Sequence, residues 1–262
     1  MTAFWRKLKA FADAGFASWS EYRAELYLWA LAGVIPIIMM GVWRQTATRH
    51  DIGMSPSELT RYFLAVFMVR QLTMVWLIWE FEQQVVTGTL SPQLLQPIHP
   101  FWRFLVWHLT ERVARTPFAL ALLLFWLWVF PDAVWLPSLK DLGLTALGVA
   151  AAFLARFVIQ CAVATIAFWS ERASSIEQLW FTVYMALSGM IAPLEMFPPS
   201  VRSFAELTPF PYMVYFPARI LLGMPVDLLK GFAVLGAWSL AGFVVFRLLW
   251  RRGLRHYSAM GA

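Results

Sequence analysis

Cysteine is almost absent from this chain. Its 262 residues contain one, Cys161, which lies in an apolar stretch. A single cysteine excludes a disulfide within the chain, and we expect this thiol to be buried and unreactive.

Motifs for nucleotide, metal and acyl chemistry are missing as well. A phosphate-binding loop places lysine after glycine in a glycine-rich turn, but each of the four lysines follows arginine or leucine. The four histidines lack the i, i+4 spacing of a zinc hydrolase helix. No Gly-x-Ser-x-Gly elbow supports a serine hydrolase, although a triad assembled in space stays open. We therefore expect no cofactor and no metal in this chain, and any soluble chemistry to come from a partner.

What the chain has instead is hydrophobic residues, which make up 60% of it. They form about six continuous runs, each close to the roughly 20 residues that cross a bilayer as a helix. Every backbone polar group must be paired inside hydrocarbon, and the runs do not alternate as barrel strands do. The sequence therefore predicts an all-α, polytopic membrane protein with no room for a soluble catalytic domain. The predicted spans are 26–43, 61–80, 104–130, 142–169, 177–195 and 228–250.

Basic residues set the predicted orientation and the expected surroundings. An even number of spans puts both termini on one side. If that side is the cytoplasm, it holds twelve Lys and Arg residues, with Arg112 and Arg115 among them, against seven on the other side. This asymmetry favours cytoplasmic termini. The net charge of +6 is spread over span ends, so we expect contacts with anionic membrane lipids and none with nucleic acid.

The segment before the first span is amphipathic. On a helical projection of residues 2–20, Phe4 and other aromatic residues share one face, opposite Lys9. This pattern predicts a helix that lies in the membrane interface. A secretory signal peptide is the alternative, but the apolar run continues past the cleavage-like site at residues 30–32.

Prolines interrupt the chain between the fifth and sixth predicted spans. Each proline removes a backbone donor and restricts the preceding residue. The stretch from Tyr212 to Leu222 is nevertheless apolar, and it is too short to cross the membrane. We therefore predict a re-entrant or interfacial region over residues 196–226 on the outer side. Glu195 and Arg219 flank the break and are expected to pair across it, either as a structural pair or as an outer gate.

Two arginines lie inside predicted spans. Arg70 is near the middle of the second span and Arg156 near the middle of the fourth. An arginine there costs about 2.5 to 3.5 kcal/mol on translocon scales, so each needs a partner or a water-filled cavity. They either line a translocation path and meet an anionic headgroup or substrate, or hold an interhelical hydrogen bond or a snorkelled position.

The loop after the second span contains turn and helix-start signals. Gly88 and Pro92 indicate a helix that ends, turns and restarts at Ser91, a residue with N-cap chemistry. A short rigid helix of this kind is suited to contact a soluble partner, and a plain connecting loop is the alternative.

The same loop carries a family resemblance. Its Gly-x-Leu-x-x-x-Leu-x-x-Pro pattern is similar to the segment after the second span of type-2 (ABC-2) permeases of ATP-binding-cassette exporters. The residues that carry this pattern are Gly88, Leu90, Leu94 and Pro97. Nearly the whole chain resembles a subgroup of short bacterial permeases encoded beside a second, related permease. The further segments of this resemblance are residues 22–25, 168–172, 209–211 and 250–259.

The resemblance implies one transmembrane domain over residues 1–262, acting as the membrane half of a bacterial inner-membrane exporter. It implies six spans, an interfacial helix before the first, a coupling region at 81–97, and re-entrant helices before the sixth. A separate ATP-binding-cassette ATPase subunit would bind ATP and magnesium. A second permease subunit would complete the complex, and the resemblance favours a different chain (a heterodimer) over a second copy. The residues to which it assigns ATPase coupling are Glu82, Gly88, Leu90, Leu94 and Pro97.

Other classes of function stay open from the sequence. A secondary transporter would show repeated halves and broken helices at the membrane midplane, whereas the proline break here is peripheral and unrepeated. An intramembrane enzyme would need convergent polar side chains at one depth, whereas acidic residues such as Glu80 and Glu171 lie at span ends. A structural membrane scaffold is a third alternative, and only an activity test would distinguish it from a transporter. The sequence thus favours a permease that exports a substrate by alternating access, and the fold does not identify that substrate.

Overall fold

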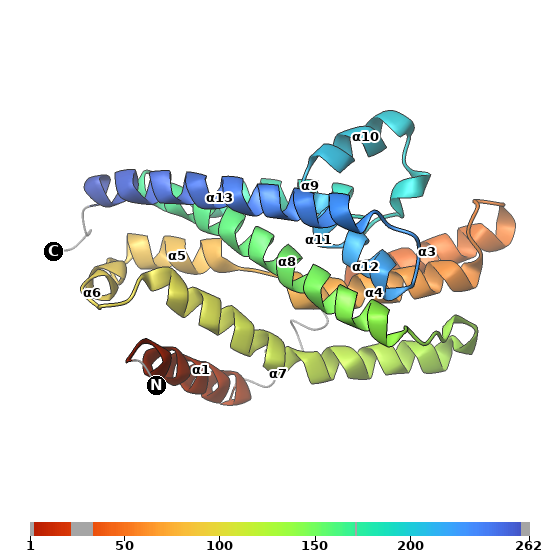
Figure 1. Ribbon diagram of the computed structural model, residues 1–262, viewed down its shortest axis with the longest axis horizontal. Coiled ribbons are helices and arrows are strands. Elements are labelled where there is room, and N and C mark those ends of the chain that lie inside the picture. The colour runs from red at the N-terminus through yellow and green to blue at the C-terminus, as the bar shows by residue number, and fades with distance from the viewer. Residues whose placement is uncertain (1–2, 22–33, 171, 258–262) are drawn as a thin grey trace.

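The computed structural model describes residues 3–21, 34–170 and 172–257 (Figure 1). These residues are mainly helical and contain no β-strand, so the all-α prediction is confirmed. The α-helices are α1 (Ala3–Glu21), α3 (Ile35–Arg49), α4 (Pro56–Thr73), α5 (Leu77–Val86), α6 (Leu90–Leu94), α7 (Pro100–Val129), α8 (Leu139–Ala164), α9 (Ala173–Leu187), α10 (Pro199–Leu207), α11 (Phe210–Met213), α12 (Tyr215–Leu221) and α13 (Leu228–His256), and the 3₁₀ helices are η2 (Pro131–Ala133), η3 (Thr165–Phe168) and η4 (Leu194–Met196).

Four helical stretches in the described part of the chain are long and apolar enough to cross a membrane. They correspond to the second, third, fourth and sixth predicted spans, and the chain is therefore a multi-pass membrane protein. The four stretches are Pro56–Val86, which combines α4 and α5, Pro100–Val129, Leu139–Phe168 and Leu228–His256.

The first and fifth predicted spans are not confirmed. Helix α9 has 15 residues, fewer than the roughly 20 that cross a bilayer. The chain turns soon after it at Gly189, whose φ of +87° is a left-handed conformation that favours glycine. Helix α3 also has 15 residues, and the start of the predicted span 26–43 lies outside the described residues.

Helix α4 is surrounded by α3, α7, α8 and α12. It begins with a capping box, in which the Glu58 N–H donates to the Ser55 hydroxyl at 3.3 Å and the Ser55 N–H donates to the Glu58 carboxylate at 2.7 Å. Its apolar residues face every direction, as in a buried helix, and Phe63 and Val66 are fully buried. Helices α7 and α13 instead expose large apolar side chains, such as Trp128 of α7 at 78%. The structure thus buries α4 and leaves α7 and α13 with surfaces suited to lipid.

The second predicted span is not one continuous helix. Residues 74–76 separate α4 from α5, and Met74 is extended, with a ψ of 139°. Neither proline nor glycine occurs in Met74-Val75-Trp76, so local sequence does not explain this break. Tertiary partners from α7 supply the explanation.

The loop after α5 forms the expected turn and short helix, with one difference. Gly88 has a φ of +74°, and α6 begins at Leu90 with Thr89 as its N-cap. The predicted start at Ser91 is therefore wrong. The Ser91 hydroxyl instead lies 3.2 Å from the Tyr257 hydroxyl, beside the end of α13.

The proline-broken region between α9 and α13 turns back into the bundle. It forms α10, α11 and α12, and the Tyr215 N–H donates to the Ser188 carbonyl at 3.2 Å, which joins α12 to the end of α9. Helix α12 packs on α4 and α8, and its Phe216 and Ile220 are buried. The segment thus adds short helices to one end of the core without crossing it.

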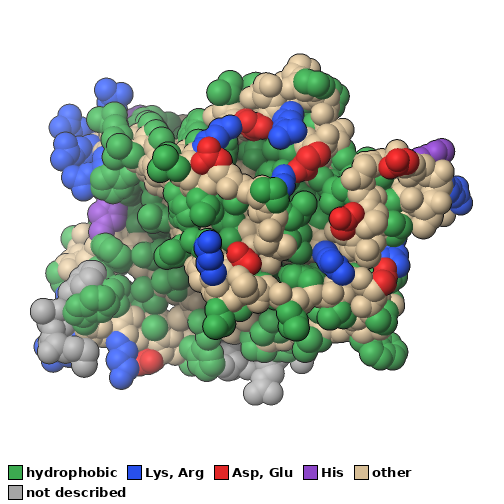
Figure 2. Space-filling model, turned by 45° about the vertical axis from the view of Figure 1, so that its right-hand side comes forward, with side chains coloured by type: hydrophobic (Ala, Val, Ile, Leu, Met, Phe, Trp, Pro, Cys, Tyr) green, Lys and Arg blue, Asp and Glu red, His purple; other side chains and the backbone are tan. Residues whose placement is uncertain are grey.

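The two ends of the molecule differ in charge. Helices α1 and α6 and the last turns of α13 lie toward one end, and α10 and the connection from α3 to α4 lie toward the other (Figure 1). Figure 2 shows Lys and Arg side chains gathered where α13 ends, with no acidic side chain beside them in that view. Helix α1 packs along α7, where a Cβ on Gly15 would come 2.7 Å from the Thr110 hydroxyl oxygen. The interfacial position of α1 stays a prediction.

Candidate functional site

Four arginines meet inside the bundle. Arg70 comes from α4, Arg112 and Arg115 from α7, and Arg156 from α8. Arg70, Arg115 and Arg156 are 3%, 4% and 0% exposed. Arg156 lies within electrostatic reach of Arg70 and Arg112, and Arg70 within reach of Arg115. We call these four residues the arginine layer, and such a layer inside a membrane protein needs strong local compensation.

Arg112 closes the break between α4 and α5. Its Nε donates to the Leu72 carbonyl oxygen at 2.6 Å, and one terminal nitrogen donates to the Met74 carbonyl oxygen at 2.6 Å. The other terminal nitrogen donates to the His108 carbonyl oxygen at 3.0 Å. The guanidinium carbon lies 3.6 Å from the centre of the Phe153 ring, a cation–π contact. Arg112 thus satisfies carbonyls that the helix break leaves open.

His108 accepts a hydrogen bond from the backbone at the other end of the break, at Trp76. The Trp76 N–H donates to His108 Nε2 at 3.0 Å, so Nδ1 carries the ring hydrogen and donates to the Phe104 carbonyl oxygen at 2.8 Å. His108 is 2% exposed. Its neutral ring therefore works as a structural linker between α7 and the start of α5.

Arg115 has a counterion on its own helix. It pairs with Glu111 one turn earlier on α7, and both side chains are buried. Arg112 and Arg115, which the sequence predicts to be cytoplasmic, both lie in the interior of α7. Without them the cytoplasmic count falls from twelve to ten, still above seven. The i, i+4 spacing of Glu111 and Arg115 was the signal that places this pair on a helix.

Arg70 and Arg156 come together but have few partners. None of the three guanidinium nitrogens of Arg156 has a hydrogen-bond partner among the residues that the structure describes, and neither has Arg70 Nε. The guanidinium carbon of Arg156 lies 4.3 Å from the centre of the Tyr184 ring. Glu177 of α9 is within electrostatic reach of Arg156, but its carboxylate accepts a hydrogen bond from Gln160 at 2.6 Å. The structure therefore gives these two arginines no hydrogen-bonded counterion within its described part.

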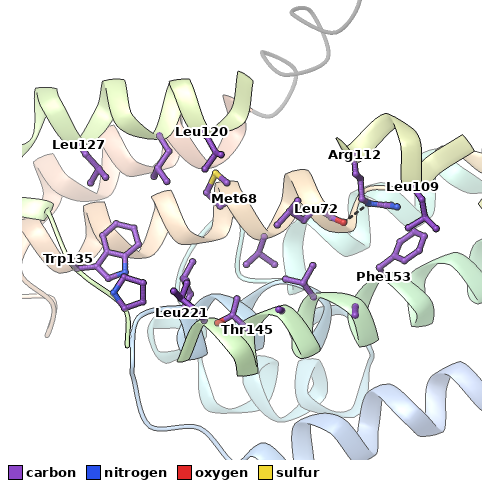
Figure 3. Close-up of a pocket in the computed structure, with 17 residues that line it drawn as sticks. Met68, Leu72, Leu109, Arg112, Leu120, Leu127, Trp135, Thr145, Phe153 and Leu221 are labelled. Carbon is purple, nitrogen blue, oxygen red and sulfur yellow. Dashed lines mark hydrogen bonds between the residues drawn. The ribbon is translucent and has the colours of Figure 1, made fainter. Parts of the chain in front are cut away.

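An apolar pocket of about 620 Å³ lies between α4, α7 and α8 beside the arginine layer (Figure 3). Arg112, Leu109 and Phe153 lie at one end, and Trp135 lies at the other (Figure 3). Arg156 follows Phe153 by one helical turn on α8, so the two share a face of that helix. Arg112 is the member of the arginine layer that lines this pocket, and the other lining residues suit a largely apolar molecule. Its remaining lining residues are Met68, Val69, Leu72, Leu120, Leu123, Leu127, Pro137, Leu142, Thr145, Ala146, Val149, Ala150 and Leu221.

The residues of the predicted coupling region divide into two groups. Glu82 accepts hydrogen bonds from the Ser174 N–H and, at 2.9 Å, from the Ser174 hydroxyl, so it caps the first turn of α9. Leu90 is fully buried, whereas Leu95 just after α6 is 88% exposed. Pro97 is also exposed. The buried group shapes the loop, and the exposed group forms its tip.

The predicted outer pair is joined by a third residue. Arg219 forms an ion pair with Glu195 and also donates to the Tyr215 hydroxyl, which in turn donates to Glu195. Sequence reasoning missed Tyr215, although its position one turn before Arg219 on α12 places the two on one face.

A second charged group lies near the outer pair. Lys230 donates to the Glu206 carboxylate at 2.8 Å, and Arg202 donates to it at 3.2 Å. The hydrogen bond from Lys230 holds the pKa of Glu206 below its usual value. The pair of Lys230 and Glu206 connects α10 to the start of α13.

Across the described ranges, no group of three or more His, Cys, Asp and Glu residues is arranged to hold a metal ion. Cys161 is a buried free thiol.

Comparison with known proteins identifies the family. The model of the family described as ABC-2 family transporter protein matches residues 53–261. This range covers most of the chain and includes α4 to α13 with the arginine layer. None of the curated proteins compared with the chain matches it. Members of this family are the transport component of ATP-binding-cassette transporters and are not themselves enzymes. Membership therefore implies association with an ATP-binding-cassette subunit. The chain therefore belongs to the ABC-2 family of transporter proteins.

Proposed function

We propose that this chain is the permease subunit of a bacterial exporter that moves a substrate outward across the inner membrane by alternating access. Its family supports a permease of an ATP-binding-cassette transporter. In this proposal a separate subunit binds ATP and magnesium and hydrolyses the nucleotide. A second permease, different from this chain, completes the membrane part, and both termini of this chain are cytoplasmic.

The observation that carries the proposal is the position of α6. This helix lies toward the same end as the basic end of α13 (Figure 1), and Leu95 just beyond it is 88% exposed. Helix α5 connects this tip to α4, which is buried among four other helices. A push on the tip would therefore reach the centre of the bundle.

The residues of the coupling region would act in different ways. Gly88 provides the turn, and the buried Leu90 and the half-buried Leu94 hold α6 against the bundle. Glu82 ties α5 to the first turn of α9, so that both helices follow the same push. The exposed Leu95 and Pro97 would contact the ATPase subunit.

Two further groups have proposed roles along the transport path. Arg70 and Arg156 would meet the substrate inside the bundle. Glu195 and Arg219 would act as an outer gate, because their ion pair joins η4 to α12 at the opposite end from α6. Separating this pair would free the short outer helices from one another.

A matched pair of leucine substitutions tests the coupling role. The chain is reconstituted in vesicles with its ATPase subunit and second permease, and permease-stimulated ATP hydrolysis is measured. Leu95→Asp should lower the stimulation by about tenfold or more, because a charge would be buried without a partner at the subunit contact. Leu136→Asp changes a leucine that is 94% exposed in the connection after η2, and it should leave stimulation unchanged.

The main rival is a transporter that is not driven by ATP. If transport continued in ATP-free vesicles with an ion gradient, or if Leu95→Asp retained full stimulation, the coupling proposal would be rejected.

A further inference from the structure

Positive charge exceeds negative charge around the arginine layer. Its four arginines face two described carboxylates, those of Glu111 and Glu177. Glu111 is engaged by Arg115 on the same helix, and backbone carbonyls satisfy Arg112. The imbalance is therefore concentrated on Arg70 and Arg156.

Arg70 and Arg156 cannot remove this imbalance by losing a proton, because arginine stays charged in proteins. Burial without a hydrogen-bonded partner is unfavourable for such a group, and more so within a bilayer. In Arg156 every guanidinium nitrogen is buried and unpartnered within the described ranges, and the hydroxyl of Tyr184 beside it also lacks a described partner. Three helices thus direct unused donors to one place, which is the requirement for binding an oxyanion.

The pocket supplies the complementary apolar half. It lies between α4, α7 and α8, and its volume of about 620 Å³ is in the range of sites for small organic ligands. Phe153 and Arg112 line the end of the pocket, and Arg156 follows one turn further on the same face of α8. A molecule with an apolar body here could place its polar end at the Arg112 and Phe153 end of the pocket, one turn of α8 from Arg156.

We propose that the substrate of this permease is an amphiphilic anion, whose apolar body occupies the pocket and whose phosphate or carboxylate group binds Arg70 and Arg156. This substrate class rests on the proposed transport function. In the described conformation Arg112 and Phe153 line the pocket, and Arg70 and Arg156 are not among its lining residues. Movement of α4 relative to α8, which a push on α6 would produce, would bring the anionic group into contact with its donors.

Binding of a simple amphiphile tests the proposal. The permease complex is placed in nanodiscs of phosphatidylcholine, and its thermal unfolding is followed while dodecyl phosphate is added. The wild-type complex should be protected. Arg156→Met and Arg70→Met should each weaken the apparent affinity by about tenfold or more, the loss expected for one charge-assisted hydrogen bond. Arg156→Lys should keep part of the affinity because it keeps the charge.

Control ligands show whether protection against thermal unfolding requires both the negative charge and the apolar chain. Dodecanol and dodecyltrimethylammonium, which have the same chain but no negative charge, should not protect. Inorganic phosphate should not protect at the same concentration, and equal protection by it would overturn the requirement for an apolar body. Arg247→Met changes an exposed arginine on α13 and should keep wild-type affinity for dodecyl phosphate, which excludes a general attraction to the surface.

Two outcomes of the binding test would overturn the proposed substrate class. Equal affinity of the Arg156→Met, Arg70→Met and wild-type complexes for dodecyl phosphate, or equal protection by the cationic amphiphile, would overturn the substrate class. The dependence of ATP hydrolysis on Leu95 is measured without this ligand. Failure of the binding test alone would therefore leave the transport proposal standing.

Discussion

The two arginines from α7 and the two from α4 and α8 share one layer inside the bundle but differ in what surrounds them. Arg112 donates to three backbone carbonyls, and Arg115 is paired with Glu111. Arg156 has no described hydrogen-bond partner for its guanidinium nitrogens. Burial of an arginine therefore does not decide its role. A carboxylate partner or backbone carbonyl acceptors mark the arginines that hold the fold, and Arg156, which has neither as a hydrogen-bond partner among the described residues, keeps donors available for a ligand.

The largest effect is expected from Arg112. Arg112→Met should lower the free energy of unfolding by about 3 to 5 kcal/mol, because the carbonyl oxygens of Leu72 and Met74 would stay buried without donors. Unfolding of the protein in lipid nanodiscs measures the change. A loss below about 1 kcal/mol would show that the break between α4 and α5 does not depend on α7.

Arg115 should show the second largest effect. Arg115→Met should lower the free energy of unfolding by about 3 kcal/mol, because Glu111 would be left buried and unpaired. The double variant Glu111→Met, Arg115→Met removes both charges and should recover most of this loss. The free energies of unfolding of the single and double variants are measured in the same way. If the losses of the two single variants add up in the double variant, the two side chains do not act as a pair.

Arg156 should behave in the opposite way to Arg115. Arg156→Met should leave the free energy of unfolding of the ligand-free protein unchanged within about 1 kcal/mol, or raise it, because no described hydrogen bond is lost and a buried charge is removed. Parallel unfolding of the Arg115→Met protein provides the comparison. A loss as large as that of Arg115→Met would assign Arg156 to the fold and remove the contrast.

The smallest effect concerns the exposed ion pairs at the outer end. The pKa of Glu206 is lowered in the folded protein, chiefly by Lys230, so its ion pair stabilises the fold fully above the unfolded value of about 4.3. This stabilisation is lost as the pH falls through the lower pKa of the folded state. The midpoint of thermal unfolding measured between pH 6 and pH 3 should therefore fall less in Glu206→Gln than in the wild type. Equal pH dependence in the two proteins would show that this pair has no net effect, as many exposed pairs do not.

The sequence predicts the helices of this protein better than it predicts their continuity. Four of the long apolar runs coincide with helical stretches that are long and apolar enough to cross a membrane, and the segment with the prolines from 193 to 217 forms short helices before α13. The break at residues 74–76 was not predicted, because hydropathy averages over side chains and takes no account of donors from another helix. The fifth predicted span is not confirmed, because α9 has 15 residues and ends before Gly189.

The candidate site was only partly visible in the sequence. Arg70 and Arg156 are recognisable as charges inside apolar runs, and the structure brings them together. Arg112 and His108 were missed, since their roles depend on carbonyl and N–H groups of α4 and α5 that lie more than thirty residues away in the chain. Glu82 was expected to face a partner, and the structure bonds it to Ser174 of α9.

The sequence by itself determined that this protein is an all-helical membrane protein with charges inside its apolar runs and a turn at Gly88, because hydrocarbon length, backbone pairing and glycine conformation act locally. Only the tertiary structure decided which of the buried arginines are satisfied. That distinction depends on a few ångströms between groups on different helices, and composition along a single helix contains no such distances.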